Sequence, residues 1–434
     1  MTTRLRLGPR LSHVSWLAIE VLALAGIFFL PFSKSAAEIG LISALFLWLL
    51  RKWPWGEPFP DAAACRLAYP AFLSLALLSA MTGDAGGLPE SLAGVCKWFK
   101  YFGYFFMSVE LFADKRRRTR LFTVFLASAT LVCLDGFYQM AAGTDLVKHY
   151  SVDIPGRLVR MQGPFSSPND LAAYLLWAAA FSFFFWAREK KWTLLSGGRL
   201  ALFALCAVSL VMTLSRSAFI GLAAGAVILA AATQPLPVIF AAAAAPFGLL
   251  LSPTLRFNFF SSLNGQDVTI RERLRIWGTT LRMIAEHPLL GTGADTFTDR
   301  FTAFSAGTET WRGYAHNCYL QIAAETGIPA LILFILPFLW ILPKETLGAR
   351  GRKLPPERMA LLAAIPAFLV QSALDTNFFA LQASTLFWVF WGVFLGGKTA
   401  QPMRAASTRA AVKRGSSKKG RTSASGKISR KRSG

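Results

Sequence analysis

The sequence carries little charge. Only 16% of its 434 residues are Asp, Glu, Lys or Arg, whereas soluble globular domains carry about 25%. The hydrophobic share is 54% and the mean hydropathy is +0.44. A soluble enzyme needs a charged surface, and a disordered protein has few apolar residues. The composition therefore excludes both classes.

Cysteine is also scarce. The five cysteines are scattered through the chain, and we expect only Cys318 to lie near the outer surface of a membrane. A disulfide framework or a cysteine-based metal site needs paired or closely spaced cysteines. The sequence therefore predicts neither of them.

Long apolar runs stand where the charge is missing. A bilayer core of about 30 Å needs roughly 20 apolar residues for each helical crossing. Runs of this kind predict an all-α polytopic membrane protein with about twelve transmembrane helices. The predicted spans are 16–33, 36–50, 67–82, 91–112, 119–141, 170–187, 199–214, 217–232, 236–251, 318–342, 358–374 and 380–397.

The basic residues orient these spans. The chain has 46 Lys and Arg against 23 acidic residues, and most of them fall in cytoplasmic segments if both termini are cytoplasmic, as the positive-inside rule requires. We therefore expect a transmembrane domain at 1–397, with a long, partly helical periplasmic loop at 252–317. Residues 398–434 predict a basic, disordered cytoplasmic tail near anionic lipid headgroups. The membrane explains the basic excess, so no nucleic-acid partner is expected.

Two outer loops, 142–169 and 252–317, are long enough to be functional. Within the second, residues 271–286 predict an amphipathic helix with arginines around an apolar stripe. The stripe consists of Leu274, Trp277, Leu281 and Ile284. One interpretation is an interfacial helix whose basic face contacts anionic lipid. The other is an arginine-rich site, because positive charge is disfavoured on this side of the membrane.

Arg216 and His316 lie where the chain meets the outer membrane edge. Arg216 falls in T-L-S-R-S-A-F between two apolar spans, where a cation is costly unless it pairs, snorkels or binds an anion. His316 falls in Y-A-H-N-C-Y as the chain re-enters the membrane. A neutral imidazole accepts a proton near neutral pH, and a structural or capping role is the alternative. Together they predict an outer-face site rich in arginine with one histidine.

Several strings, taken in order, resemble the O-antigen ligase/polymerase superfamily of membrane glycosyltransferases. They are R-M-Q-G-P-F-S-S-P-N-D-L-A (160–172), T-L-S-R-S-A-F-I-G-L (213–222), R-L-R-I-W from Arg273, H-P-L-L-G-T-G-A-D-T-F (287–297), H-N-C-Y-L-Q-I-A-A-E-T-G-I-P (316–329), and L-D-T-N (374–377) leading into L-F-W-V-F-W-G (386–392). The first 150 residues match only in being hydrophobic. We interpret the two glycines at 291 and 293 as backbone-turn residues rather than a phosphate loop, because no Gly-Lys-Ser/Thr follows.

The resemblance implies a metal-independent, inverting glycosyltransferase of the bacterial inner membrane that uses no cofactor. The donor would be a glycan on undecaprenyl pyrophosphate, and the acceptor would be lipid A–core or another glycan. The protein would also contact membrane lipids. The family's catalytic residues correspond to Arg216, Arg273 and His316. Those implied in substrate binding are Arg160, Arg271, Arg275, Asn317 and Asp375, with Asn169 in the same motif as Arg160. The arginines would stabilise the leaving diphosphate, and His316 would take the acceptor proton or orient the diphosphate.

Other functions stay open from the sequence. Ligation to lipid A–core is favoured over polymerisation of lipid-linked repeats and over glycosylation of protein Ser or Thr. Transport of a lipid-linked sugar is the alternative of a different class, and Glu20 and Asp135 within predicted spans are its best support. A metal-dependent glycosyltransferase is disfavoured because the short outer loop around Lys34 lacks an acidic pair.

Overall fold

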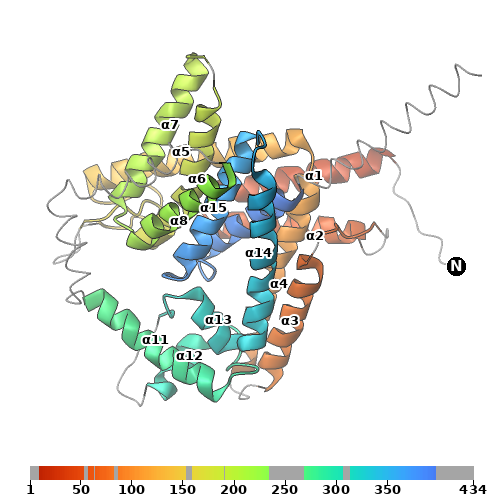
Figure 1. The fold of residues 1–434 in the computed structure, drawn as a ribbon, viewed down its shortest axis with the longest axis vertical. Coiled ribbons are helices and arrows are strands. Elements are labelled where there is room, and N and C mark those ends of the chain that lie inside the picture. The colour runs from red at the N-terminus through yellow and green to blue at the C-terminus, as the bar shows by residue number, and fades with distance from the viewer. Residues whose placement is uncertain are drawn as a thin grey trace, which may run out of the picture.

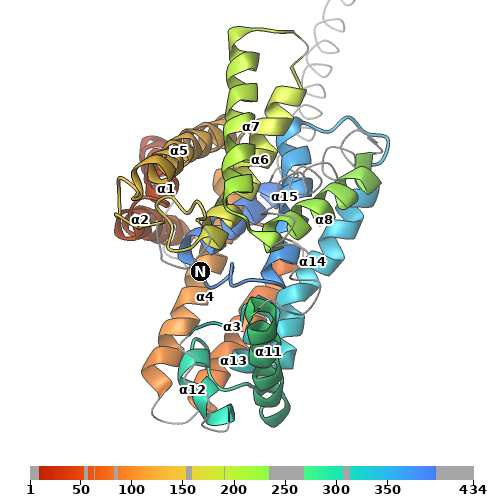
Figure 2. The same cartoon turned by 90° about the vertical axis from the view of Figure 1, so that its left-hand side faces the viewer.

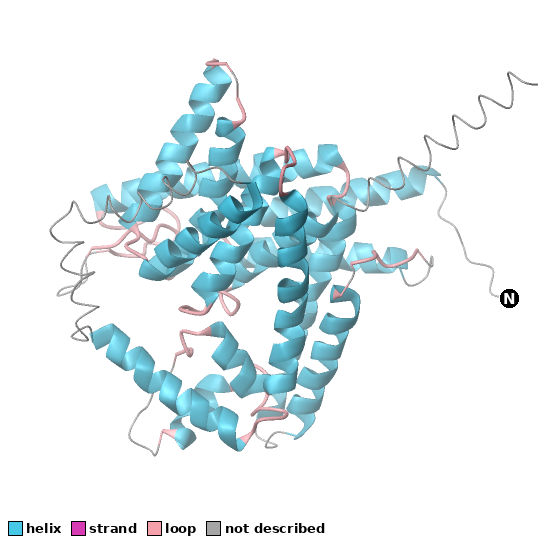
Figure 3. Ribbon diagram, viewed as in Figure 1, coloured by secondary structure: helices cyan, strands magenta, loops and turns pink. Residues whose placement is uncertain are grey.

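The computed structural model describes residues 9–52, 57–62, 64–82, 87–152, 159–189, 191–233, 268–305 and 313–396. Within these ranges the regular elements are all helices, joined mostly by short loops (Figure 3). The helices are α1 (Pro9–Phe29), α2 (Lys34–Lys52), α3 (Cys65–Thr82), α4 (Leu88–Leu111), α5 (Lys115–Ala142), α6 (Pro168–Ala187), α7 (Leu194–Met212), α8 (Arg216–Thr233), α11 (Val268–Glu286), α12 (Phe297–Phe304), α13 (Cys318–Thr326), α14 (Ile328–Ala349), α15 (Pro356–Ser372) and a last helix, Leu381–Gly396.

Among the helices that the structure describes, five are long and apolar enough to cross a membrane, namely α3, α5, α6, α7 and α14. Three further apolar helices are shorter: His13–Phe29, Arg216–Ala232 and Leu381–Gly396. The chain is thus an all-α membrane protein, as predicted, whereas the number of twelve crossings stays a prediction. The predicted span 236–251 and the basic tail 398–434 lie outside the described residues.

The predicted span 318–342 is not one helix. It breaks at Gly327 into the short α13 and the apolar α14. Gly327 has a φ of 86°, and a Cβ at this position would lie 2.1 Å from the carbonyl oxygen of Leu289. The loop that contains Leu289 therefore inserts at the junction, and only glycine permits both the left-handed backbone and the contact.

The helices gather in groups that place the site (Figures 1 and 2). α3 packs between α4 and α14, while α1 packs along α2 and against α5. α15 packs against both α6 and α8, and α11, α12 and α13 collect at one end of the molecule. The long loop is thus partly helical, as predicted, and α11 begins three residues earlier than the predicted helix 271–286.

Close packing of α8 on α15 brings distant residues together. A Cβ at Gly221 would lie 2.4 Å from the carbonyl oxygen of Ala367, and one at Gly225 would lie 2.2 Å from that of Ala363. Small residues four apart allow two helix backbones to approach this closely. The contact holds Arg216, the first residue of α8, near Asp375 in the turn after α15.

The apolar stripe of α11 is not its most buried face. Leu274 and Leu281 are 57% and 53% exposed. The face that is buried instead contains Ile276, Thr279, Thr280 and Met283. Two long-range hydrogen bonds select this face, from Arg273 to Leu374 and from Trp277 to Ala315. Helical periodicity alone carries no information about such partners.

Buried carboxylates fix the first part of the loop 142–169. Asp145 accepts hydrogen bonds from the backbone N–H groups of Val147 and Lys148, and Asp135 accepts one of 2.8 Å from Leu146. The end of the loop is anchored by a backbone hydrogen bond of 3.0 Å from Met161 to Met212. This anchor delivers the neighbouring Arg160 to the start of α8.

Candidate functional site

Five of the residues singled out from sequence converge. Arg160, before α6, lies close enough to Asp375, Arg216 and Arg273 to feel their charges. Burial lowers the pKa of Arg160, the nearby Asp375 opposes that shift, and the two other arginines add to it. His316, before α13, faces the same Asp375. The site thus holds three guanidinium groups, one carboxylate and one imidazole.

Backbone carbonyls anchor two of the arginines. Arg160 donates from Nε to the carbonyl oxygen of Thr213 at 2.8 Å and from Nη2 to Oδ1 of Asn169 at 3.0 Å. Arg273 donates from Nη1 to the carbonyl oxygen of Leu374 at 2.9 Å. Neutral carbonyl and amide partners orient a guanidinium without cancelling its charge. The cluster therefore keeps an excess of positive charge suited to an anion.

Asp375 is held between His316 and the start of α8. Its Oδ1 lies 3.6 Å from Nδ1 of His316, and its side chain is only 5% exposed. The same carboxylate accepts from the backbone N–H of Thr376 at 2.9 Å and from the hydroxyl of Ser217 at 3.4 Å. The thiol of Cys318 donates to the Asp375 carbonyl at 3.1 Å. These contacts hold the carboxylate beside Nδ1 of His316.

Two residues at the site adopt the left-handed backbone region without being glycine. Leu214, two residues before Arg216, has a φ of 52°, and His316 has a φ of 50°. Such conformations persist only where surrounding contacts enforce them, and they concentrate at functional sites. Asn317 caps α13, because its Oδ1 accepts from the backbone N–H groups of Tyr319 and Leu320.

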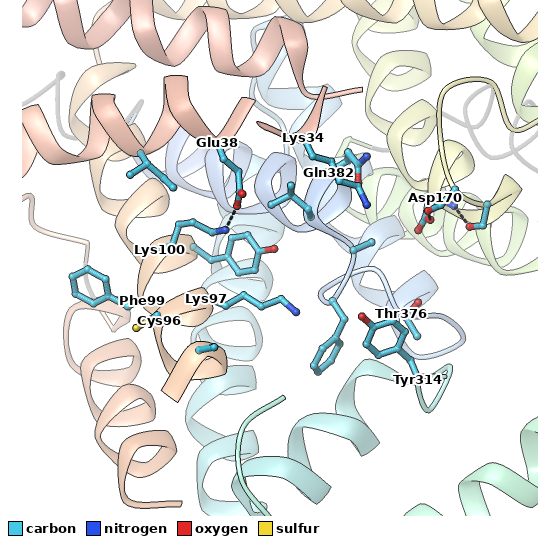
Figure 4. A pocket seen from close by; sticks show the side chains of 18 of the residues that line it. Lys34, Glu38, Cys96, Lys97, Phe99, Lys100, Asp170, Tyr314, Thr376 and Gln382 are labelled. Atoms are coloured by element: carbon cyan, nitrogen blue, oxygen red, sulfur yellow. Dashed lines mark hydrogen bonds and ion pairs between the residues drawn. The ribbon is translucent and has the colours of Figure 1, made fainter. Parts of the chain in front are cut away.

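A cavity of about 960 Å³ opens beside His316 and Asp375. Its polar wall includes Lys34 and Glu38 of α2 and Lys97 and Lys100 of α4, with Lys100 paired to Glu38 (Figure 4). Further lining comes from the start of α6 and from the segment after Asp375. The opposite end is apolar and is lined by Ile42, Leu45, Phe46, Leu49 and Phe99.

The arginines on either side of Arg273 are more exposed than Arg273 itself. Arg271 and Arg275 are both exposed, whereas Arg273 is partly buried and reaches the turn after α15. Of the three arginines in R-E-R-L-R, Arg273 is the one whose charge acts on Arg160. A substrate contact by Arg271 or Arg275 stays a prediction.

Sequence reasoning missed the lysines of the cavity. Lys97 and Lys100 lie within the predicted span 91–112, and a charged residue inside an apolar helix is itself a signal of function. Lys97 forms an ion pair of 3.2 Å with Asp295 from the outer loop. This contact joins α4 to the loop that carries H-P-L-L-G-T-G.

The glycines of that loop are backbone-turn residues, as predicted. Gly291 and Gly293 have φ values of 66° and 114°. The N–H of Gly293 donates to the carbonyl oxygen of Glu325 at 2.9 Å, and Thr292 donates to that of Ala324 at 2.9 Å. The loop thereby satisfies carbonyls at the end of α13 that a helix leaves open.

Glu325, at the end of α13, is a buried acid. Burial and the nearby Asp295 raise its pKa to about 8, while hydrogen bonds from Gln321 and the Asp295 backbone and the charge of Lys97 oppose the rise.

Among the described residues, no group of three His, Cys, Asp or Glu side chains is placed to hold a metal ion.

The fold and site define an all-α membrane protein with an arginine-rich cluster next to a cavity that both polar and apolar side chains line. Residues 201–335 match the family model described as O-antigen ligase, and this match supports the resemblance to the O-antigen ligase superfamily. The match includes Arg216, Arg273 and His316 but not Arg160 or Asp375. A comparison with curated proteins returns no match.

Proposed function

We propose that the protein transfers a glycan from undecaprenyl pyrophosphate to an acceptor hydroxyl at the periplasmic face of the bacterial inner membrane. The family supports an O-antigen ligase or polymerase-like activity in general. The observation that carries the finer proposal is the convergence of three arginines, Asp375 and His316 beside a half-apolar cavity. The transfer is proposed to need no metal ion and to invert the anomeric carbon.

The arginines would hold and stabilise the diphosphate. Arg216 stands at the positive end of the α8 dipole, and the first turn of α8 contains no acidic residue. An anion is favoured at this position, because helix N-termini are suited to phosphate. Arg160 and Arg273 add planar donors from two other segments. Fixed positive charge of this kind performs the task that a divalent metal performs in other transferases.

His316 would act as the general base. Asp375 faces Nδ1 and favours the tautomer with its proton there, which leaves Nε2 able to accept one. In the proposed step the acceptor oxygen bonds to the anomeric carbon as its proton passes to Nε2. The bond between that carbon and the diphosphate oxygen breaks, and the diphosphate leaves with the electron pair. One displacement of this kind inverts the configuration.

The apolar end of the cavity supports a lipid-linked donor. Ile42 and Phe46 of α2 and Phe99 of α4 line it, and these side chains are 46%, 59% and 53% exposed. Exposed apolar side chains on membrane helices face lipid at no cost. A prenyl chain could therefore lie against α2 and α4 while its diphosphate reaches the arginines.

Lipid A–core is the acceptor we favour, and a second lipid-linked glycan is the alternative. Transport of a lipid-linked sugar has less support, because both deep carboxylates have structural partners. Glu20 pairs with Arg117 at 3.4 Å and with Arg120 at 2.6 Å, and Asp135 holds the outer loop through Leu146.

The test is a reconstituted reaction of the purified protein with undecaprenyl-pyrophosphate glycan and lipid A–core, with the His316→Ala variant beside it. Glycan on lipid A–core, absent with the variant, is the expected result. Longer lipid-linked glycan with unmodified lipid A–core would assign a polymerase instead. No product from either acceptor with a folded sample would refute the proposal and favour transport.

A further inference from the structure

The backbone of Ala315, directly before His316, is held from both sides. Its N–H donates to Oε1 of Gln321 at 3.0 Å, and its carbonyl oxygen accepts from Nε1 of Trp277 at 2.9 Å. Asn317, directly after His316, is fixed as the cap of α13. Two anchored neighbours leave His316 little choice of backbone conformation, and its φ of 50° is the result.

Gln321 can accept from Ala315 only if its amide points the right way, and Glu325 sets that direction. Nε2 of Gln321 donates to Oε1 of Glu325 at 2.9 Å. Both oxygens of Glu325 accept, Oε1 from Gln321 and Oε2 from the Asp295 N–H, and the Ala315 N–H can only donate, so the NH₂ group of Gln321 faces Glu325 and its oxygen faces Ala315. Gln321 and Glu325 are each only 1% exposed, so no water replaces a hydrogen-bond partner that is lost there.

Glu325 is itself tied to the outer loop and to the cavity. Its Oε2 accepts from the backbone N–H of Asp295 at 3.0 Å, and the side chain of Asp295 pairs with Lys97, which lines the cavity. The hydroxyl of Ser79 on α3 donates to the Glu325 carbonyl oxygen at 2.9 Å. The chain of contacts therefore runs from three separate segments to the peptide that precedes His316.

We infer that Gln321 and Glu325 are positioning residues that fix the Ala315 peptide and thereby aim the His316 ring at the acceptor hydroxyl. This inference rests on the proposed function, because it takes His316 as the base. Neither residue touches the reacting atoms. Their effect is on the geometry of proton transfer, which tolerates little misplacement.

Gln321→Met tests the acceptor role of the amide. Methionine has a similar length but cannot accept from Ala315, so kcat should fall about ten- to hundredfold while the donor KM stays within about threefold. Thr326→Val is the matched control on the same helix. Thr326 is equally buried and donates only to the carbonyl of Ile322 within α13. Loss of kcat in both variants alike, or in neither, would overturn the inference.

Gln321→Glu gives a conditional rescue. One oxygen of the new carboxyl accepts from the Ala315 N–H, and the other faces Glu325. The two carboxyl groups must then share one proton, which replaces the hydrogen bond that the Gln321 NH₂ group donates in the wild type. The other charged groups near Glu325 are Asp295 and Lys97. This variant should approach wild-type kcat at acidic pH and lose it as the pH rises, relative to the wild type. A profile parallel to that of the wild type would contradict the shared-proton geometry.

A readout without turnover separates the inference from the proposed function. The chain has four histidines, so ring-¹⁵N-labelled protein gives few signals, and His316→Gln identifies the one from His316. In the wild type the neutral ring should carry its proton on Nδ1, whereas Gln321→Met should shift or split that signal and Thr326→Val should not. An unchanged His316 signal in Gln321→Met overturns the positioning role. A changed signal in a protein with no transferase activity would leave positioning intact and refute the proposed function.

Discussion

Asp375→Asn is the most informative single substitution at the site. Asparagine keeps the shape of the side chain and an oxygen for the Thr376 N–H, but it removes the charge 3.6 Å from Nδ1 of His316. At that separation two unit charges attract by about 1.2 kcal/mol in water and about 4.6 kcal/mol at an effective dielectric constant of about 20. Because the Asp375 side chain is 5% exposed, we expect a loss toward the upper value. The corresponding decrease in kcat lies between about sevenfold and about two-thousandfold.

The donor KM should move differently from kcat. Without Asp375, the charges of Arg160, Arg216 and Arg273 are less compensated, so binding of the anionic donor should be unchanged or tighter. The assay is steady-state transfer from undecaprenyl-pyrophosphate glycan, measured for Asp375→Asn alone and in the His316→Ala background. The second substitution should add little once His316 is gone, because the two groups act as a unit. A kcat within about twofold of the wild type, or a loss confined to KM, would refute the pairing of Asp375 with an imidazolium.

Three further predictions follow from the geometry. Arg273→Ala should lower kcat about a hundred- to a thousandfold. Arg271→Ala and Arg275→Ala, whose side chains are exposed, should stay near wild-type kcat. Equal losses in all three variants would contradict a specific catalytic role for Arg273. Transfer should survive complete treatment with EDTA, and abolition that Mg²⁺ or Mn²⁺ restores would contradict the metal-free step. The pKa of Glu325 is raised to about 8, so between about pH 4.3 and 8 the folded state holds a proton that the unfolded state has released. The free energy of unfolding should therefore fall as the pH rises through that window, by at most about 1.4 kcal/mol per pH unit. Glu325→Gln should flatten this dependence of the melting temperature, and an unchanged slope would show that Glu325 does not titrate there.

Most of the helices were predictable from the length of the apolar runs. Runs of about 20 apolar residues place a helix at each predicted span within the described residues, because a bilayer demands that length. The break at Gly327 was not predictable from hydropathy, since it depends on the Leu289 carbonyl that lies 2.1 Å from the position of a Cβ. A local pattern does not reveal which distant loop will insert into it.

The candidate site was also predictable only in part. Arg216, Arg273 and His316 were singled out from charge, membrane position and motif, and the structure brings them together with Asp375. The orientation of α11 was not predictable from the sequence, because it is set by a hydrogen bond from Arg273 to Leu374, across 101 positions of sequence. Gln321 had no sequence signal of its own, because a glutamine in an apolar helix looks the same whether it holds a catalytic loop or only fills space.

The anomeric configuration of the product tests the central claim most directly. One in-line displacement, with the diphosphate held by Arg216 and Arg273 and the proton taken by His316, must invert the sugar carbon that leaves the donor. Nuclear magnetic resonance of the purified product, compared with the donor of defined configuration, measures this outcome. We predict inversion in every turnover by the wild type. Retention would require a covalent glycosyl intermediate or a second displacement, and it would contradict the mechanism.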